Sequence, residues 1–295
     1  MKPDHQGSHG LPGSTMSIDF TANGNARRYR LFVSVPHAPP PPAGYPVLVV
    51  LDGNVCAPLF AAAVTCLGLG DEIYPPLVVG IGYPEQELGV WATRRRLDFT
   101  PGTPELDLLA PGPTPAFGGL ESFLDAIVFD VAKIVREHWA VDASRSALFG
   151  HSHGGLAVLH ALFTRPAMFR NWIAVSPTIW FARRAMRAKE AAFARCVEHH
   201  EVAPRLHLSV GSLEGETPAQ LAPDLPFSRE EIEHQIKAAC MIGNARKMAR
   251  RLNALKGAPG YKIRYALLRG ETHSSTPFAM VCDALRMAFA QGQWH

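Results

Sequence analysis

The sequence has few of the features of proteins that depend on disulfides or membranes. Its 295 residues include five cysteines, an odd number, which are widely scattered and form no CxxC pair. This pattern indicates reduced thiols in the protein core and a cytoplasmic location rather than a disulfide framework. No apolar run reaches the length that crosses a bilayer, so we expect no membrane partner.

A strong excess of charge of either sign is also missing. The 29 Lys and Arg residues nearly balance the 26 Asp and Glu residues, and the net charge of +3 is too small to suggest nucleic acid as a partner. The basic stretches ARRAMRAK (182–189) and ARKMARRLN (245–253) have helix-like surroundings. We expect both to be solvent-exposed helix faces.

Metal-ligand spacings are absent as well. The stretches HSH (151–153) and CVEHHE (196–201) place histidines close together, but neither has a third ligand at a known spacing such as HExxH. We therefore expect no metal site and no cofactor.

Apolar segments of two kinds alternate along the chain. Short Val- and Leu-rich segments predict strands, and continuous runs of this kind are typical of strands covered on both faces. These strands are expected at 28–36, 43–54, 75–84, 145–150, 171–177, 205–211 and 261–270. Between them, apolar residues recur at helical spacing, for example over 118–138. The alternation predicts an α/β protein with a mostly parallel central sheet and helices on both faces.

The ends and the loops complete the predicted organisation. Residues 1–16 are rich in Gly, Pro and His and lack the apolar core of a secretory signal, so we expect a disordered leader before one domain at 17–295. Two long connections, 84–117 and 211–228, follow predicted strands. Ligands bind at the carboxyl ends of parallel strands, which makes these loops candidates for function.

The stretch LFGHSHGGLAVLH (148–160) contains the pattern G-x-S-x-G between a strand-like and a helix-like segment. Such a turn exposes a nucleophilic serine and is so tight that the flanking Gly150 and Gly154 must lack bulk. The following helix directs its N-terminus, and the backbone N–H of His153, at a developing oxyanion. We predict that Ser152 is a nucleophile.

A nucleophilic serine needs a base and an acid that orients it. In α/β-hydrolases they follow in the order acid, then histidine. His273 lies after the last predicted strand and before the final helix, so we predict it as the base. Glu214 follows the preceding strand and is the favoured acid, with Glu216 and Asp224 as alternatives. Without a carboxylate, a Ser–His dyad would remain.

A second oxyanion donor is expected from the loop after the VLVVLDG strand. The N–H of Asn54 is the candidate, with Gly53 letting the backbone turn close to a substrate. Asp52 is expected to be structural, accepting hydrogen bonds from amides of the loop.

Six segments occur in register with a known family: YPVLVVLDGN, VVGIGYP, RRRLDFTP, LFGHSHGGLAVLHALF, AVSPTIW and GETHSS. From about residue 17 to the C-terminus, the chain resembles the esterase branch of the α/β-hydrolases that includes the enterobactin and bacillibactin esterases. The resemblance implies an α/β-hydrolase fold and hydrolysis of ester bonds, which in the best-known members are those of a tri-ester siderophore. One departure is His153, where the family usually has an apolar residue.

Residue by residue, the resemblance assigns Ser152 and His273 to the family's nucleophile and histidine. The loop with Glu214 matches the place of the acid, and Asn54 and His153 match the oxyanion donors.

Two further positions are suggested only by the resemblance. Arg95 matches an arginine that faces the anionic catecholate ligand, although a salt bridge to Asp98 is an equal alternative. Trp180 matches a pocket wall, although simple packing would also explain it.

The predicted function is that of a serine esterase acting through an acyl-enzyme on a small-molecule ester, with a ferric catecholate siderophore as the candidate substrate. Three alternatives stay open. They are an acyltransferase, a general carboxylesterase or thioesterase of the same fold, and a non-catalytic protein that binds an iron chelate.

Overall fold

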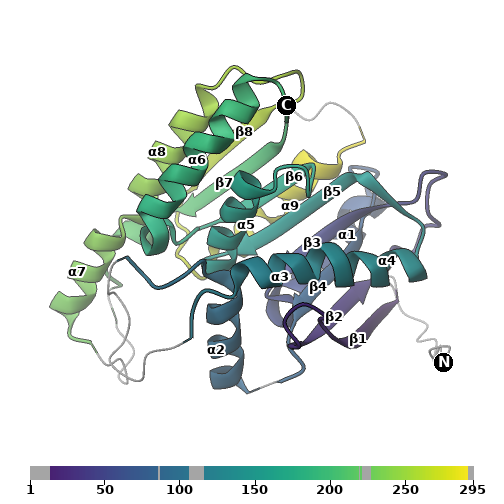
Figure 1. The fold of residues 1–295 in the computed structure, drawn as a ribbon, viewed down its shortest axis with the longest axis horizontal. Helices are drawn as coiled ribbons and strands as arrows, with labels where there is room; N and C mark the ends of the chain where they lie inside the picture. Colours follow the sequence, from purple (N-terminus) through teal and green to yellow (C-terminus); the bar gives the residue numbers. More distant parts are fainter. Residues whose placement is uncertain (1–13, 86, 106–115, 219, 221–226, 292–295) are drawn as a thin grey trace.

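The computed structural model describes residues 14–291 except 86, 106–115, 219 and 221–226. Eight strands form one sheet in the order β1-β2-β4-β3-β5-β6-β7-β8 (Figure 1). The pairs β1/β2 and β2/β4 are antiparallel and the others parallel, which confirms the predicted mostly parallel sheet. The strands are β1 (Thr15–Thr21), β2 (Arg28–Ser34), β3 (Tyr45–Leu51), β4 (Leu77–Gly82), β5 (Val141–His151), β6 (Asn171–Val175), β7 (Arg205–Gly211) and β8 (Lys262–Leu268).

Strand β1 was not predicted from the sequence. It begins at Thr15, two residues before the predicted start of the domain at residue 17. None of its seven residues is fully buried, because β1 is an edge strand, and so it lacks the apolar signal of the inner strands. Residues 1–13 of the predicted leader lie outside the described residues.

Helices cover both faces of the sheet (Figure 1). One face is covered by α1 (Gly53–Leu69) and α9 (Thr276–Phe289), and the other by α2 (Leu88–Phe99), α3 (Leu120–Ala126), α4 (Ala132–His138), α5 (His153–Thr164), α6 (Arg183–Glu198) and α8 (Met241–Asn253). Along β3, Val49 and Leu51 pack into the first of two cores and Leu48 and Val50 into the other. This division explains why the inner strands are continuously apolar.

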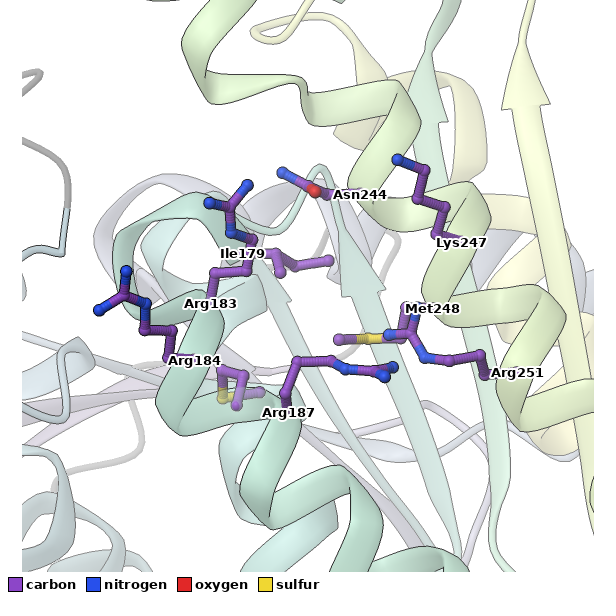
Figure 2. Close-up of a pocket in the computed structure, with 9 residues that line it drawn as sticks. Ile179, Arg183, Arg184, Arg187, Asn244, Lys247, Met248 and Arg251 are labelled. Atoms are coloured by element: carbon purple, nitrogen blue, oxygen red, sulfur yellow. The ribbon is translucent and has the colours of Figure 1, made fainter.

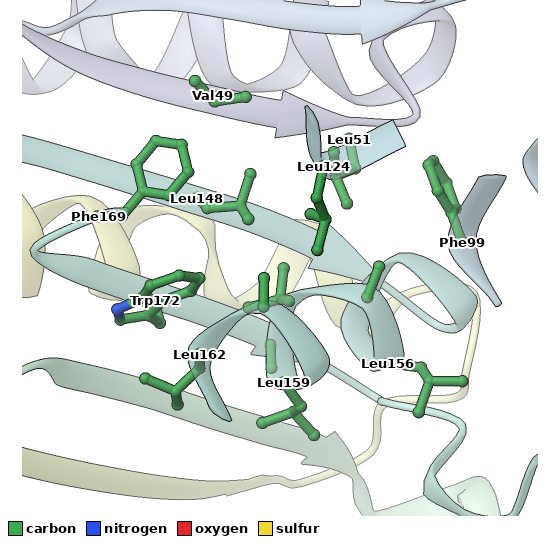
Figure 3. Packing of buried hydrophobic residues seen from close by; sticks show 14 of the residues in the cluster. Val49, Leu51, Phe99, Leu124, Leu148, Leu156, Leu159, Leu162, Phe169 and Trp172 are labelled. Carbon is green, nitrogen blue, oxygen red and sulfur yellow. The ribbon is translucent and has the colours of Figure 1, made fainter. Parts of the chain in front are cut away.

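The α5 side holds the larger core. Figure 3 shows Leu156, Leu159 and Leu162 of α5 in one packed cluster with Leu148 of β5 and Trp172 of β6. All five side chains are inaccessible to solvent. Because α5 begins directly after Ser152, this packing fixes the position of the proposed nucleophile relative to the sheet.

Several local predictions differ from the structure. The connection 84–117 contains α2, and the helix expected over 118–138 is interrupted by a π-helical turn at Ile127–Val131. Of the five cysteines, all free, Cys56 is buried but Cys66 and Cys240 are exposed, so the expected core packing of those two is wrong. Cys240 has a φ of 44° and separates α7 (Arg229–Ala239) from α8.

Two short 3₁₀ helices follow the carboxyl ends of β6 and β7. They are η2 (Ile179–Ala182) and η3 (Ser212–Gly215). Among the described residues, no helix combines the length and the apolar character needed to cross a bilayer.

Candidate active site

Ser152 occupies a sharp turn between β5 and α5. Its φ of 59° and ψ of −118° lie outside the regions that residues with side chains normally adopt, which is typical of a nucleophile turn. Its N–H donates to the carbonyl of Val175 at 2.9 Å, and its carbonyl accepts from Leu156 at 3.0 Å and Thr178 at 3.2 Å. Contacts from β6 and α5 therefore hold the strained backbone in place.

The glycines around Ser152 differ in how closely they are packed. A Cβ on Gly150 would lie 2.2 Å from the carbonyl oxygen of Gly154, so the prediction that Gly150 must lack bulk is confirmed. A Cβ on Gly154 would meet its nearest neighbour, a carboxylate oxygen of Asp52, at 3.5 Å, an ordinary contact. The same prediction for Gly154 is therefore wrong. Gly155 is the second restricted position, because its Cβ would lie 2.9 Å from the carbonyl oxygen of Val175.

His273 lies in the turn between β8 and α9, and Glu214 lies in η3. The Nδ1–H of His273 donates to Oε2 of Glu214 at 2.8 Å. The other carboxylate oxygen, Oε1, accepts from the Ser176 hydroxyl at 2.5 Å and from the Gly211 N–H at 2.7 Å. Burial raises the pKa of Glu214, but His273 and the other donors outweigh it, so the pKa is lowered overall. The carboxylate is thus ionised at neutral pH.

The alternative acids do not occupy this position. Glu216 is exposed and forms no bond with His273 in the described part of the chain. Asp224 lies outside the described residues. Because Glu214 reaches His273, the geometry is that of a histidine oriented by a carboxylate rather than of an isolated Ser–His dyad.

The Ser152 hydroxyl forms no hydrogen bond with the His273 imidazole in the described part of the chain. The His273 ring lies beside the residue that precedes Ser152, with 4.7 Å between the ring centroids of His151 and His273. Bonds between a nucleophile and its base often tighten only in the complex with substrate. The arrangement therefore places a histidine–carboxylate pair next to the strained serine.

His151 has a position that sequence reasoning missed. Its Nε2–H donates to the backbone carbonyl of His273 at 2.8 Å. Burial lowers the pKa of His151 to about 3, with a further contribution from His273, and the imidazole is neutral at pH 7. A neutral ring thus holds the turn that contains His273. The only sequence signal was its place next to Ser152.

The backbone N–H groups of Asn54 and His153 lie in the first turns of α1 and α5, which follow the adjacent parallel strands β3 and β5. Neither N–H donates to an acceptor among the described residues. The first amides of a helix have no partner within the helix, so both remain available to a ligand. The Asn54 side chain is fixed by two bonds to the backbone of Tyr83, at 2.8 and 2.9 Å.

The loop before Asn54 turns differently from the prediction. Asp52, with a φ of 55°, is the residue in the left-handed region. Gly53 instead allows α1 to approach β4, because a Cβ there would lie 2.6 Å from the backbone of Gly80. The carboxylate of Asp52 caps no amide in its own loop but accepts both Nε–H and Nη2–H of Arg95, at 2.7 and 2.8 Å.

Arg95, in α2, therefore has a different partner from the one expected. The alternative of a salt bridge to Asp98 is wrong, since Asp98 is bonded by Arg27 at 2.5 Å and by the Tyr83 hydroxyl at 3.2 Å. The Arg95 side chain is 15% exposed and its guanidinium also lies over the Trp91 ring, 5.1 Å from the centroid. Contact of Arg95 with a substrate stays a prediction.

The turn η2 packs against the start of α5. Phe181 meets the His153 imidazole edge-on, with 5.3 Å between the ring centroids. Burial, followed by the nearby Arg95, lowers the pKa of His153 to about 3, so this ring is also neutral at pH 7. Trp180 is 9% exposed and belongs to the larger core. Its role as a pocket wall stays a prediction.

The described residues contain no group of three or more His, Cys, Asp or Glu side chains placed to hold a metal ion. Two pairs of a basic and an acidic side chain lie near Ser152 instead, His273 with Glu214 and Arg95 with Asp52. Such a set suits proton transfer and a structural ion pair.

Comparisons with known proteins identify the family of the chain. A family model described as "Putative esterase" matches residues 23–246. The chain is 32% identical over 285 residues to the ferri-bacillibactin esterase of Bacillus subtilis strain 168, with 94% of this chain and 90% of that protein covered. It is 33% identical over 263 residues to the siderophore triacetylfusarinine C esterase of Aspergillus fumigatus, with coverage of 85% and 83%.

A solved structure shows the same fold. The crystal structure of the BES protein from Bacillus cereus matches with a TM-score of 0.79 at 27% identity, and the match covers 96% of this chain and 99% of that one. Together, the family match, the relatives and the sheet order show that the chain belongs to this esterase family and has the α/β-hydrolase fold that its sequence predicts.

Proposed function

We propose that the chain is a serine esterase that cleaves ester bonds of a siderophore through an acyl-enzyme on Ser152. The observation that carries the proposal is the 2.8 Å bond between His273 and Glu214, formed beside a serine held in a strained turn. A core serine or histidine with only a packing role needs neither feature.

In the first step, the Ser152 hydroxyl attacks the ester carbonyl and passes its proton to Nε2 of His273. The ionised Glu214 stabilises the resulting imidazolium through Nδ1–H. The N–H groups of Asn54 and His153 bind the oxyanion of the tetrahedral intermediate, where two helix N-termini add favourable dipoles.

The intermediate then collapses, and His273 returns its proton to the departing alcohol. Water attacks the acyl-enzyme with His273 again as the base, and the acid is released from Ser152. The neutral state of His151 supports this cycle. A second cation beside His273 would oppose its protonation.

The substrate class is suggested by the relatives, whose names specify siderophore esters. Among siderophore esters, a ferric tri-catecholate tri-ester is the candidate. Hydrolysis of its ester bonds would yield linear fragments.

The nucleophile is tested with Ser152→Ala. We expect hydrolysis of p-nitrophenyl butyrate to fall roughly 10³-fold or more, because the members of such a unit act together. Ser274→Ala, at an exposed serine next to His273, is the matched control and should keep its rate. A fluorophosphonate adduct should map to Ser152. Full turnover by a folded Ser152→Ala protein would end the proposal.

The substrate is tested with the ferric tri-catecholate tri-ester itself, followed by chromatography of the products. Linear fragments in water support a siderophore esterase. Esters formed with added alcohols in preference to hydrolysis would indicate an acyltransferase, and tight binding with no cleavage would indicate a binding protein.

A further inference from the structure

A cavity with a volume of about 440 Å³ lies between α6 and α8, outside the serine site described above. Its walls, shown in Figure 2, are formed by Ile179, Arg183, Arg184, Met186, Arg187, Asn244, Lys247, Met248 and Arg251. The volume is within the range of small-molecule sites in proteins. The two basic stretches of the sequence, which were expected to be plain solvated helix faces, supply its cations.

Positive charge in the cavity exceeds the negative charge that could neutralise it. Arg251 forms a bidentate pair with Glu190, at 2.5 and 2.7 Å, and Arg187 lies 3.6 Å from the same carboxylate. Two guanidinium groups thus share one acid. In Figure 2, Arg187 and Arg251 extend toward one another across the cavity from α6 and α8.

The remaining cations have no acidic side-chain partner within the described ranges, which holds for Arg183, Arg184 and Lys247. Glu105 is the nearby acid at the start of α6, and its carboxylate accepts the backbone N–H groups of Arg184 and Ala185. The three unpaired cations are exposed, so a ligand with several negative charges could reach them.

The floor of the cavity is apolar. Met186 and Met248 are almost completely buried. Methionine thioethers in general form favourable contacts with aromatic rings. Guanidinium groups around the rim bind oxyanions and also stack on ring faces. Cations above an apolar floor suit a ligand that combines aromatic rings with anionic oxygens.

The turn η2 joins the cavity to the serine site. Ile179 lines the cavity, while Phe181, two residues later, packs on the imidazole of His153. The N–H of Thr178, just before η2, donates to the carbonyl of Ser152. The turn η2 therefore contacts both the cavity lining and the residues beside Ser152.

We propose that the cavity between α6 and α8 binds the anionic iron–catecholate end of the substrate, with Arg183, Arg187 and Lys247 as its main charged contacts. This inference rests on the proposed function. A ferric ion bound by three doubly deprotonated catecholates has a net charge of −3, which complements the excess of cations. The catecholate rings would lie over Met186 and Met248.

The experiment measures binding alone. The Ser152→Ala protein is dialysed to equilibrium against the ferric tri-catecholate tri-ester, which it does not turn over. Adding Arg183→Gln and Lys247→Gln should raise the Kd roughly 10- to 100-fold. Adding Arg246→Gln and Arg250→Gln, which remove the same charge from exposed positions of α8 outside the cavity, should change it by less than about twofold. Equal effects of the two pairs would overturn the proposal.

Three further binding measurements use the protein without substitutions in the cavity. Raising NaCl from about 0.05 to about 0.5 M should weaken binding of the ferric complex several-fold, because the contacts are ionic. The iron-free tri-ester, whose phenols stay protonated near pH 7, should bind at least about tenfold more weakly. A Kd independent of salt, or equal affinity for tripolyphosphate, which has the charge but no rings, would overturn the assignment. Loss of hydrolysis with these affinities intact would instead contradict only the esterase function.

Discussion

The serine site (Asn54, Ser152, His153, Glu214 and His273) and the basic cavity are both contacted by η2, yet they are built in different ways. Near Ser152 the charges are paired, and the two imidazoles that flank it are neutral. The groups proposed for the oxyanion are backbone amides. In the cavity the cations exceed the acids, and most of them are exposed.

The difference follows from what each region would do. Stabilising a transition state requires dipoles that are already oriented, so small displacements should be costly. Attracting an anionic ligand requires net charge, which long flexible side chains provide over a range of positions. We therefore expect the serine site to depend on geometry and the cavity to depend on charge.

The largest effect is expected from Glu214→Gln. The change preserves shape but removes the charge that orients His273, so kcat for p-nitrophenyl butyrate should fall about 10³- to 10⁴-fold. Glu216→Gln, at the exposed neighbour, is the control and should keep its rate. A fall of less than about tenfold for Glu214→Gln would contradict the proposal that this carboxylate orients His273 for catalysis.

The next largest effect is expected when a methyl group is added at Gly150. Gly150→Ala places a Cβ 2.2 Å from a backbone oxygen, and the free energy of unfolding should fall by about 3 kcal/mol or more. Gly154→Ala, whose Cβ meets only ordinary contacts, should change it by less than about 1 kcal/mol. Urea unfolding of both variants measures the difference. Similar stabilities would contradict the close approach of β5 and α5.

Replacing arginine with lysine compares the two regions directly. At Arg95 the change keeps the charge but loses the bidentate geometry with Asp52, and it should cost roughly 1–3 kcal/mol of stability. At Arg183 the same change keeps the positive charge on which the cavity is expected to depend. The free energy of unfolding should therefore shift by less than about 0.5 kcal/mol, and the Kd of the ferric complex by less than about threefold. Thermal unfolding measures the stability of both variants, and equilibrium dialysis measures the Kd of the ferric complex. An equal loss of stability in Arg95→Lys and Arg183→Lys would contradict the distinction between a site that depends on geometry and a cavity that depends on charge.

The last prediction concerns the dependence of stability on acid. The pKa of His153 is lowered from 6.5 to about 3 in the folded chain, so the unfolded chain binds a proton first as the pH falls. The free energy of unfolding should therefore decrease as the pH drops from about 6.5 toward 3, on the order of 2 kcal/mol by pH 5 from this group. His151 contributes in the same window.

His153→Phe removes the titrating ring and keeps an aromatic group against Phe181. The decrease in stability between pH 7 and 5 should be shallower in this variant, as measured by urea unfolding at several pH values. The unsubstituted protein, measured at the same pH values, is the reference. An unchanged slope in His153→Phe would show that the ring is not held neutral.

Much of the site was predictable because it depends on chain order. Ser152 was predicted as the nucleophile from a strand, a glycine-bounded turn and a helix, and His273 was predicted as the base from its place after the last strand. The same order placed Glu214 and its alternatives Glu216 and Asp224 after the preceding strand, and it could not separate them. In the described structure, Glu214 is the carboxylate bonded to the His273 ring. His151 escaped prediction because its partner is a backbone carbonyl 122 residues away.

The sequence by itself determined the alternation of strands and helices and the local turn that presents Ser152, because hydrophobic periodicity and glycine placement act over a few neighbouring residues. Only the tertiary structure decided that Arg95 pairs with Asp52, 43 residues away, rather than with Asp98 in its own helix. It also joined two basic helices, far apart in the chain, into one cavity. Such pairings depend on which elements pack together, and packing is a property of the whole fold.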